Sequence, residues 1–194
     1  MTTVEHVDTR GKSAIACTVA VRDRWSRAPL VVAYDYGKTL APCGTPAHRD
    51  GIPADQPLWP DAVKVLRWLW QVHGIPAILS SNAAPSEPRR SALAAAGVAD
   101  CFIGSLISHE RPFRKPDPRW YTDVLALARR RHPHCQPADV VHVGDSLKHD
   151  VIGPRLAGMR AVWISPHTHP RPAGAMVRII PGIAHLPAAL GLRP

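Results

Sequence analysis

The chain has 194 residues, 45% of them hydrophobic, which is typical of one globular domain with a full hydrophobic core. It contains no apolar run long enough to span a bilayer, and its charged first residues do not match a signal peptide, so we expect a cytoplasmic protein without membrane contact. The formal net charge of +9 favours anionic ligands and leaves nucleic acid open as a partner, although no basic stripe interleaved with aromatic residues supports it.

The four cysteines stand apart and form no C-x-x-C pair, which favours free thiols in a reducing compartment over disulfides. His132, His134 and Cys135 lie close together in the sequence, but a structural zinc site needs more ligands at defined spacings. We therefore expect neither disulfides nor zinc to stabilise the fold.

Apolar runs alternate with helical patterns along most of the chain. Residues 1–28 lack strong periodicity and are predicted to be an N-terminal extension, with one strand near 14–21, whereas residues 29–194 are predicted to form the core domain. Strands are predicted at 30–34, 76–79, 101–103, 140–143, 161–164 and, at an edge, 177–180; helices at 60–73, 87–96, 118–131, 147–157 and 183–190; and loops at 41–58 and 166–174.

The predicted strands are continuous apolar runs, which indicates a parallel sheet that is covered on both faces. Together with the strand–helix alternation, this predicts an α/β fold: a Rossmann-like three-layer α/β/α sandwich with a mainly parallel sheet. Ligands bind such sheets beyond the carboxyl ends of the strands. Three polar residues follow predicted strands there, namely Asp35, Ser81 and Asp145.

Four short motifs occur in order along the chain. They are Asp35-Tyr-Gly-Lys-Thr39 after a hydrophobic strand, Ser81-Asn82 after another, Lys115 before a proline, and Gly144-Asp145 followed by Asp150. With this order and spacing, the chain from about residue 30 to 165 resembles the haloacid dehalogenase (HAD) superfamily of hydrolases, specifically phosphatase-like members with a minimal cap or none.

The resemblance implies a magnesium-dependent phosphoryl-transfer site. Asp35 would be the nucleophile and would form an aspartyl-phosphate, which splits one difficult displacement into two steps. A hard cation such as Mg²⁺ would offset the repulsion between this carboxylate and a phosphate, and it prefers oxygen ligands. The resemblance assigns the metal to Asp35, the backbone carbonyl of Gly37, Asp145 and Asp150.

The resemblance also assigns the groups that hold the substrate. Lys115 would steady the transferring phosphoryl group by its charge, and Ser81 would hydrogen-bond the phosphoryl oxygens. Asn82 and its neighbouring backbone amides would join them, and Thr39 would fix the turn after the nucleophile. Asp35, Ser81 and Lys115 are thus the predicted catalytic residues, with Thr39 and Asn82 as predicted substrate-binding residues.

One position departs from the family pattern. Family phosphatases carry an aspartate two residues after the nucleophile, where it protonates the leaving group and later activates water, but this chain has Gly37. General acid–base catalysis is typically worth about 10²–10⁴-fold in rate. Three interpretations stay open: a good leaving group needs no acid; Tyr36, Lys38 or a loop histidine replaces it; or the protein binds a phosphorylated ligand and turns it over poorly.

The spacing of the motifs leaves no room for a sizeable cap domain. Only residues 41–58 lie between the first motif and the next helix, and one helix and one strand fill the second insertion point. The site should therefore be open to a large substrate or covered by a partner subunit in a homo-oligomer. The favoured function is a phosphatase-like hydrolase; the alternatives are a catalytically weak binding or regulatory protein, a nucleic-acid end phosphatase and a dehalogenase-like hydrolase.

Overall fold

A computed structural model describes residues 25–43, 47–49, 52–54, 56–166 and 176–193. The strand predicted near 14–21 and most of the loop predicted at 166–174 lie outside these residues. No helix in the described part of the chain is long and apolar enough to cross a membrane.

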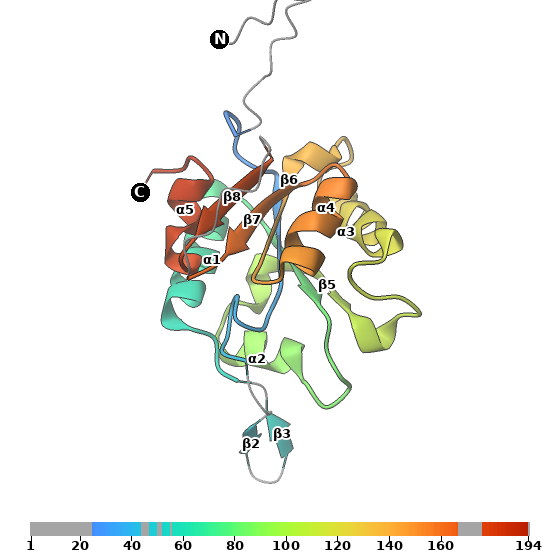
Figure 1. The fold of residues 1–194 in the computed structure, drawn as a ribbon. Coiled ribbons are helices and arrows are strands. Elements are labelled where there is room, and N and C mark those ends of the chain that lie inside the picture. Colours follow the sequence, from blue (N-terminus) through green and yellow to red (C-terminus); the bar gives the residue numbers. More distant parts are fainter. Residues whose placement is uncertain (1–24, 44–46, 50–51, 55, 167–175, 194) are drawn as a thin grey trace, which may run out of the picture.

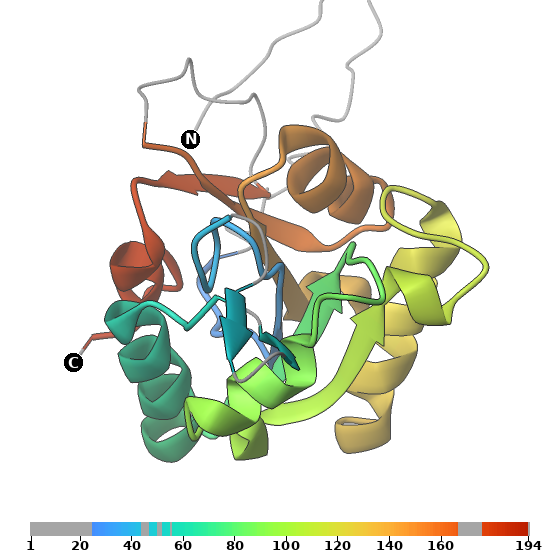
Figure 2. The same cartoon turned by 90° about the horizontal axis from the view of Figure 1, so that it is seen from below.

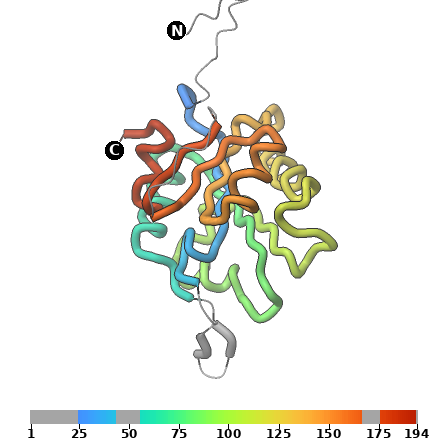
Figure 3. The backbone as a smooth tube through the Cα atoms, viewed as in Figure 1, coloured from blue at the N-terminus to red at the C-terminus, as the bar shows by residue number. Residues whose placement is uncertain are grey.

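A six-stranded parallel sheet forms the centre of the molecule, in the order β5-β4-β1-β6-β7-β8. The chain starts the sheet in the middle, builds one edge and then the other, as the tube in Figure 3 traces. The strands are β1 (Val31–Tyr34), β4 (Ala77–Ser81), β5 (Phe102–Ile107), β6 (Val140–Gly144), β7 (Arg160–Ile164) and β8 (Val177–Ile180). The α/β fold predicted from the continuous apolar runs is confirmed.

Helices cover both faces of the sheet, as Figures 1 and 2 show from two directions. On one face lie α1 (Pro60–His73), α2 (Arg89–Ala95) and α5 (Leu186–Ala189); on the other lie α3 (Pro118–Arg131) and α4 (Gly153–Leu156). Successive residues of β1 point to opposite faces, because Val32 and Tyr34 pack with the first set of helices and Val31 and Ala33 with the second. This two-sided burial is the reason the strands carry no polar alternation.

The ends of α1 match the signals in its sequence. Pro60 begins the helix, Asp61 lies in its first turn, and Gly74 ends it in the left-handed conformation at φ 62°. The amide of Gly74 donates to the carbonyl of Trp70 at 3.0 Å, which satisfies one of the last carbonyls of the helix.

The segment predicted as a loop at 41–58 contains a small antiparallel hairpin instead. Its strands, β2 (Ala47–Arg49) and β3 (Ile52–Ala54), stand off the main body below the sheet in Figure 1. Asp50-Gly51 is a common hairpin-turn pair and was the available signal, which the surrounding prolines and glycines obscured. Apart from this hairpin, the described residues hold only α2, β5 and short turns at the two insertion points, so the expected core without a sizeable cap is confirmed there.

The helix predicted at 147–157 is not continuous. Residues Leu147–Ile152 form a π-helical turn (η4), and α4 follows from Gly153. The amide of Gly153 bonds to the carbonyl of Lys148, and Pro154 has no N–H with which to continue an α-helical ladder. The proline therefore divides the segment into two short turns.

Two residues near the end of the predicted extension, Trp25 and Arg27, contact the domain. Trp25 is buried in the core that also holds α1, and the guanidinium groups of Arg160 and Arg178 lie 5.1 and 4.5 Å from its ring centroid. Arg160 Nη1 also donates to the carbonyl of Arg27 at 2.9 Å. The domain boundary near residue 28 stays a prediction, because residues 1–24 are not described.

Gly153 offers a test of how tightly α4 packs on α3. A Cβ atom at this position would lie 2.1 Å from the hydroxyl oxygen of Tyr121, whose hydroxyl donates to the carbonyl of His149 at 2.6 Å. We predict that Gly153→Ala lowers the free energy of unfolding by about 1–3 kcal/mol in urea denaturation, since one of the two helices must shift. Gly182→Ala is the control, because its added Cβ meets nothing within 4 Å; equal stability of the two variants would refute the prediction.

Candidate active site

Three carboxylates meet at the carboxyl ends of the central strands. Asp35 follows β1, Asp145 follows β6, and Asp150 reaches back from η4; one oxygen of each lies within 4.8 Å of the others. The parallel pairing of β1 with β6 brings the first two strand ends together. The sheet therefore assembles, from separate parts of the sequence, the acidic cluster that the motifs predict.

Lys115 lies against this cluster from the segment before α3. Its Nζ donates to Asp35 Oδ1 at 2.8 Å and to Asp150 Oδ1 at 2.7 Å, and its side chain is 1% exposed. Burial opposes the charge of the ammonium group, but the two carboxylates outweigh burial and raise the pKa of Lys115. Lys115 and the two carboxylates thus stabilise one another's charged forms, with Lys115 and Asp150 buried and Asp35 partly exposed.

One lysine does not balance three carboxylates. The three carboxylates and the buried Lys115 leave a formal charge of −2, the charge that a single divalent cation would neutralise, and the exposed Lys38 offsets only the charge of Asp145 from nearby. Burial raises the pKa of Asp35, and the charge of Asp150 raises it further. The charge of Lys115 lowers it but does not outweigh burial. Burial and the charges of Asp35 and Asp150 likewise raise the pKa of Asp145.

Mg²⁺ fits this donor set, because it prefers hard oxygen ligands and few protein carboxylates. Asp35 and Asp145 would be direct ligands, the backbone carbonyl of Gly37 a further one, and Asp150 a ligand or an orienting group. The uncompensated charge of the cluster is the observation that favours the ion.

Gly144 makes room for Asp150. A Cβ atom on Gly144 would lie 2.2 Å from the carboxyl carbon of Asp150, so only glycine lets this carboxylate lie against the end of β6. The amide of Ser146 donates to Asp150 Oδ2 at 3.0 Å and fixes its second oxygen. The glycine of the Gly-Asp motif is therefore required by packing.

Asn82 holds the main chain of Lys115 at both ends. Its Nδ2 donates to the carbonyl of Lys115 at 3.0 Å, and the amide of Lys115 donates to Asn82 Oδ1 at 3.1 Å. Ser81 lies at the end of β4 with 1% exposure, close in sequence to this clamp. Thr39 is fully buried, and its hydroxyl has no hydrogen-bond partner among the described residues.

A polar network under the carboxylates was missed in the sequence. Trp120 Nε1 donates to Ser80 Oγ at 2.9 Å, and Ser80 Oγ lies 3.0 Å from His142 Nε2. His142 Nδ1 in turn faces Asp150 Oδ1 at 3.7 Å. Burial and the charge of Lys115 hold the pKa of His142 well below its ordinary value, so the imidazole is neutral at pH 7. The available signal was a histidine within the otherwise apolar run 140–143.

The structure separates the residues considered as replacements for the missing acid. The hydroxyl of Tyr36 is directed to the carbonyl of Gln56 at 2.8 Å, and the residue is fully buried, which removes it from the list of candidates. Lys38, by contrast, is exposed, has a positive φ of 55°, and lies beside Asp145. A Cβ atom on Gly37 would meet nothing within 4 Å, so the position has room for a side chain.

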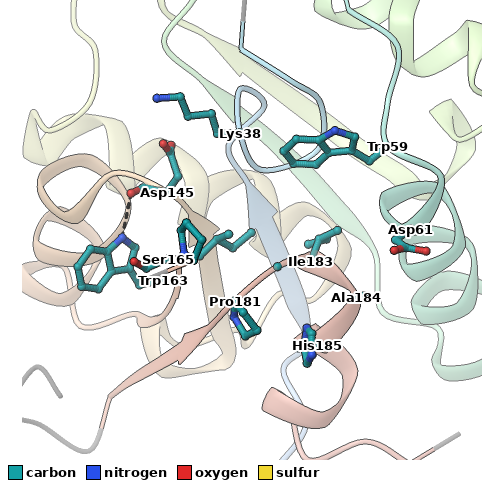
Figure 4. Close-up of a pocket in the computed structure, with 13 residues that line it drawn as sticks. Lys38, Trp59, Asp61, Asp145, Trp163, Ser165, Pro181, Ile183, Ala184 and His185 are labelled. Carbon is teal, nitrogen blue, oxygen red and sulfur yellow. Dashed lines mark hydrogen bonds between the residues drawn. The ribbon is translucent and has the colours of Figure 1, made fainter. Parts of the chain in front are cut away.

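A cavity of about 670 Å³ opens beside the carboxylates. Figure 4 shows Lys38 and Asp145 on one side of it and Trp59 on the other, with Pro181, Ile183 and His185 from the segment after β8. The indole of Trp163 donates to the carbonyl of Asp145 at 2.8 Å and ties this wall to the acidic cluster.

Known proteins resemble this chain in sequence and fold. A family model described as a haloacid dehalogenase-like hydrolase matches residues 20–158. A phosphoserine phosphatase from Thermus thermophilus is 37% identical over 108 residues, which is 56% of this chain and 41% of that protein. The chain thus spans less than half of that relative's length.

Two solved structures extend the comparison. An uncharacterized protein from Listeria monocytogenes has a TM-score of 0.63 at 23% identity, covering 82% of this chain and 96% of that one, which is a likeness of fold. A HAD phosphatase from Thermococcus onnurineus has a TM-score of 0.55 at 27% identity, covering 69% of this chain and 58% of that one. The family identified from the motifs is confirmed.

The raised pKa of Asp145 predicts how the metal-free protein responds to pH. A carboxyl group whose pKa is raised on folding binds its proton more tightly in the folded state, so stability is lost as pH rises through the folded pKa. Without divalent cations, Asp145→Asn should be more stable than the unaltered protein at about pH 7, and this advantage should shrink toward about pH 4. The measurement is urea unfolding in a chelator at several pH values.

The exposed Asp100, which lies far from the cluster in the sequence, supplies the matched control as Asp100→Asn. A constant difference between Asp145→Asn and the unaltered protein across the pH range would show that burial and the neighbouring carboxylates do not raise the pKa of Asp145.

Proposed function

Because the chain belongs to the haloacid dehalogenase-like hydrolase family, we propose that it is a magnesium-dependent phosphatase that attacks its substrate through Asp35. The observation that carries the proposal is the pair of contacts from Lys115 Nζ, at 2.8 Å to Asp35 and 2.7 Å to Asp150. These contacts support the proposal because a buried cation lies beside Asp35, where a transferring phosphoryl group would develop charge if Asp35 is the nucleophile.

In the first step, an oxygen of Asp35 attacks the phosphorus atom. The bond from phosphorus to the leaving oxygen breaks, and that oxygen keeps the electron pair. The product on the protein is an aspartyl-phosphate, a covalent intermediate of the kind that carboxylate nucleophiles form. Lys115 offsets the negative charge brought to Asp35, and the hydroxyl of Ser81 donates to a phosphoryl oxygen.

In the second step, water attacks the phosphorus atom of the aspartyl-phosphate. The bond from phosphorus to the Asp35 oxygen breaks, Asp35 is regenerated as a carboxylate, and inorganic phosphate leaves as dihydrogen phosphate with the oxygen and both protons of the water. When bound by Asp35, Asp145 and the Gly37 carbonyl, Mg²⁺ would act as a Lewis acid on the phosphoryl oxygens. Asp150, held by Lys115 and the Ser146 amide, keeps the remaining donors in place.

Gly37 shapes which substrates the site can use. No carboxylic acid lies two residues after the nucleophile to protonate the leaving group. The site is therefore suited to leaving groups that depart as stable anions, as in acyl phosphates, phosphoanhydrides and aryl phosphates. The same substitution favours the second candidate, a protein that binds a phosphorylated ligand and turns it over slowly.

Asp35→Asn tests the nucleophile. The amide cannot form an aspartyl-phosphate, so we predict that magnesium-dependent phosphate release falls to background across a panel of acyl phosphates and phosphate esters. Asp100→Asn, at an exposed position that does not line the cavity, serves as the control and should retain release. Residual activity above a few per cent, in a variant that unfolds like the unaltered protein, would rule out Asp35 as the nucleophile. No release from the unaltered protein would favour the binding role.

Gly37→Asp tests the missing acid. The added side chain meets nothing within 4 Å at its Cβ, and an acid there would protonate poor leaving groups. We predict that hydrolysis of alkyl phosphate esters rises by about 10²-fold, with a smaller gain for acyl phosphates. Initial rates on the two substrate classes measure the effect. An unchanged ratio between them would indicate that another group already fills the role.

A further inference from the structure

The cavity beside Asp145 adjoins the turn that follows Asp35, because Lys38 of that turn lines it. In an in-line displacement the leaving oxygen lies opposite the attacking oxygen of Asp35, on the side where the family carries its acid. Here that side holds Gly37 and then Lys38, and Lys38 lines the cavity together with Asp145. The cavity therefore begins at Lys38 and at Asp145, which has an oxygen within 4.8 Å of one of Asp35, and it extends toward Trp59 and the segment after β8 (Figure 4).

The walls of the cavity are mainly apolar, although Asp61, Ser165 and His185 also line it. They include two indoles and three further apolar residues, Trp59, Trp163, Pro166, Pro181 and Ile183. Such walls favour a ligand with an aromatic ring over one with a chain of charged or hydroxylated groups, because they offer apolar contact area and aromatic faces on which a ring can stack. The volume of about 670 Å³ lies within the usual range for small-molecule sites, about 300–1,000 Å³.

Local structure holds this wall in place. Trp59 precedes α1, and its amide donates to the carbonyl of Leu40 at 2.9 Å, which ties it to the turn after the nucleophile. In the same turn, the amide of Lys38 donates to the carbonyl of Ala41 at 2.7 Å. Lys38 takes up a left-handed backbone conformation at φ 55°, which directs the chain sharply at the mouth of the cavity.

We propose that this cavity is the leaving-group subsite and that it takes an aromatic ring carrying the leaving oxygen, as in an aroyl or aryl phosphate. The inference rests on the proposed phosphatase function and narrows its substrate class. When the bond from phosphorus to oxygen breaks, the oxygen keeps the electron pair and leaves as an aromatic carboxylate or aryl oxide. The positive charge of Lys38 stabilises this departing anion. Such stabilisation takes the place of the proton that the family's acid would donate to the leaving oxygen.

Benzoyl phosphate and acetyl phosphate give a matched pair of substrates. Both release a carboxylate, and they differ chiefly in the ring, so the ratio of their kcat/KM values reports on the cavity. We expect benzoyl phosphate to be preferred by about tenfold or more. A ratio near one, in a protein that hydrolyses acetyl phosphate, would overturn the aromatic subsite while leaving the phosphatase proposal intact.

Gly182→Phe tests the cavity directly. Gly182 lines the cavity, and an added Cβ meets nothing within 4 Å, so the phenyl group can occupy the space without disturbing the core. The preference for benzoyl phosphate should fall to near one. Trp68→Leu is the control, because Trp68 lies on α1 and packs against His73 with ring centroids 4.3 Å apart, so it should keep the preference. A preference retained in Gly182→Phe would place the ring elsewhere.

Lys38→Met tests the role of the cation with a series of substituted phenyl phosphates. Rates should depend more steeply on the acidity of the leaving phenol than in the unaltered protein, and Lys38→Arg should restore the shallower dependence. Arg131→Met, which removes an exposed cation in the last turn of α3, should leave the slope unchanged. Equal slopes in all variants would remove Lys38 from the proposal.

If no substrate is hydrolysed, the phosphatase proposal itself is overturned. A binding measurement can still test the aromatic subsite in that case. Calorimetric titration with phenylphosphonate and methylphosphonate needs no turnover. Binding of phenylphosphonate about tenfold more tightly, with the difference lost in Gly182→Phe, would support the subsite on its own. Equal affinities would overturn it.

Discussion

The ion pairs of Lys115 with Asp35 and Asp150 are the interaction on which the site depends. Carboxylates this close repel one another, and burial strengthens the repulsion because the surroundings screen charge weakly. A buried lysine at 2.8 and 2.7 Å offsets part of that repulsion and itself keeps its charge only because the carboxylates are there. Removing Lys115 would leave the carboxylates of Asp35 and Asp150 without their buried cation, which is strongly destabilising.

The elements around this group fix its parts from several directions. Asn82 holds the main chain of Lys115, Gly144 leaves space for the carboxylate of Asp150, and the network from Trp120 through Ser80 to His142 fills the layer beneath. Such support keeps the charged groups in one geometry without relying on a loop. It also explains why these positions are a small residue, an amide and a neutral imidazole rather than further charges.

The proposed chemistry depends on the glycine that replaces the family's acid in the turn after Asp35, the proposed nucleophile. With Gly37 in place of the family's acid, no carboxyl group at this position can donate a proton to the leaving group. The next residue is Lys38, and the space beside the Gly37 Cα is open. A cation stabilises a departing anion without transferring a proton, so it suits leaving groups that are stable as oxyanions. The neighbouring cavity with its two indoles provides apolar area for such a group.

The sequence by itself determined the sheet-and-helix order, the family and most of the candidate site residues. Continuous apolar runs require burial on both faces, and strand-end positions such as Asp35 and Asp145 follow directly from that order. Local signals were less reliable where backbone geometry depends on neighbours. The β2–β3 hairpin and the π-helical turn before Pro154 were both missed as elements.

Only the tertiary structure decided how these residues combine. It brought Lys115 within bonding distance of two carboxylates, turned the hydroxyl of Tyr36 away to Gln56, and gave His142 a place beneath Asp150. It also built the cavity from Trp59, Trp163 and the segment after β8, which are far apart in the chain. The physical reason is that strand periodicity specifies which face a side chain takes, whereas distances between side chains depend on sheet order and packing across the whole domain.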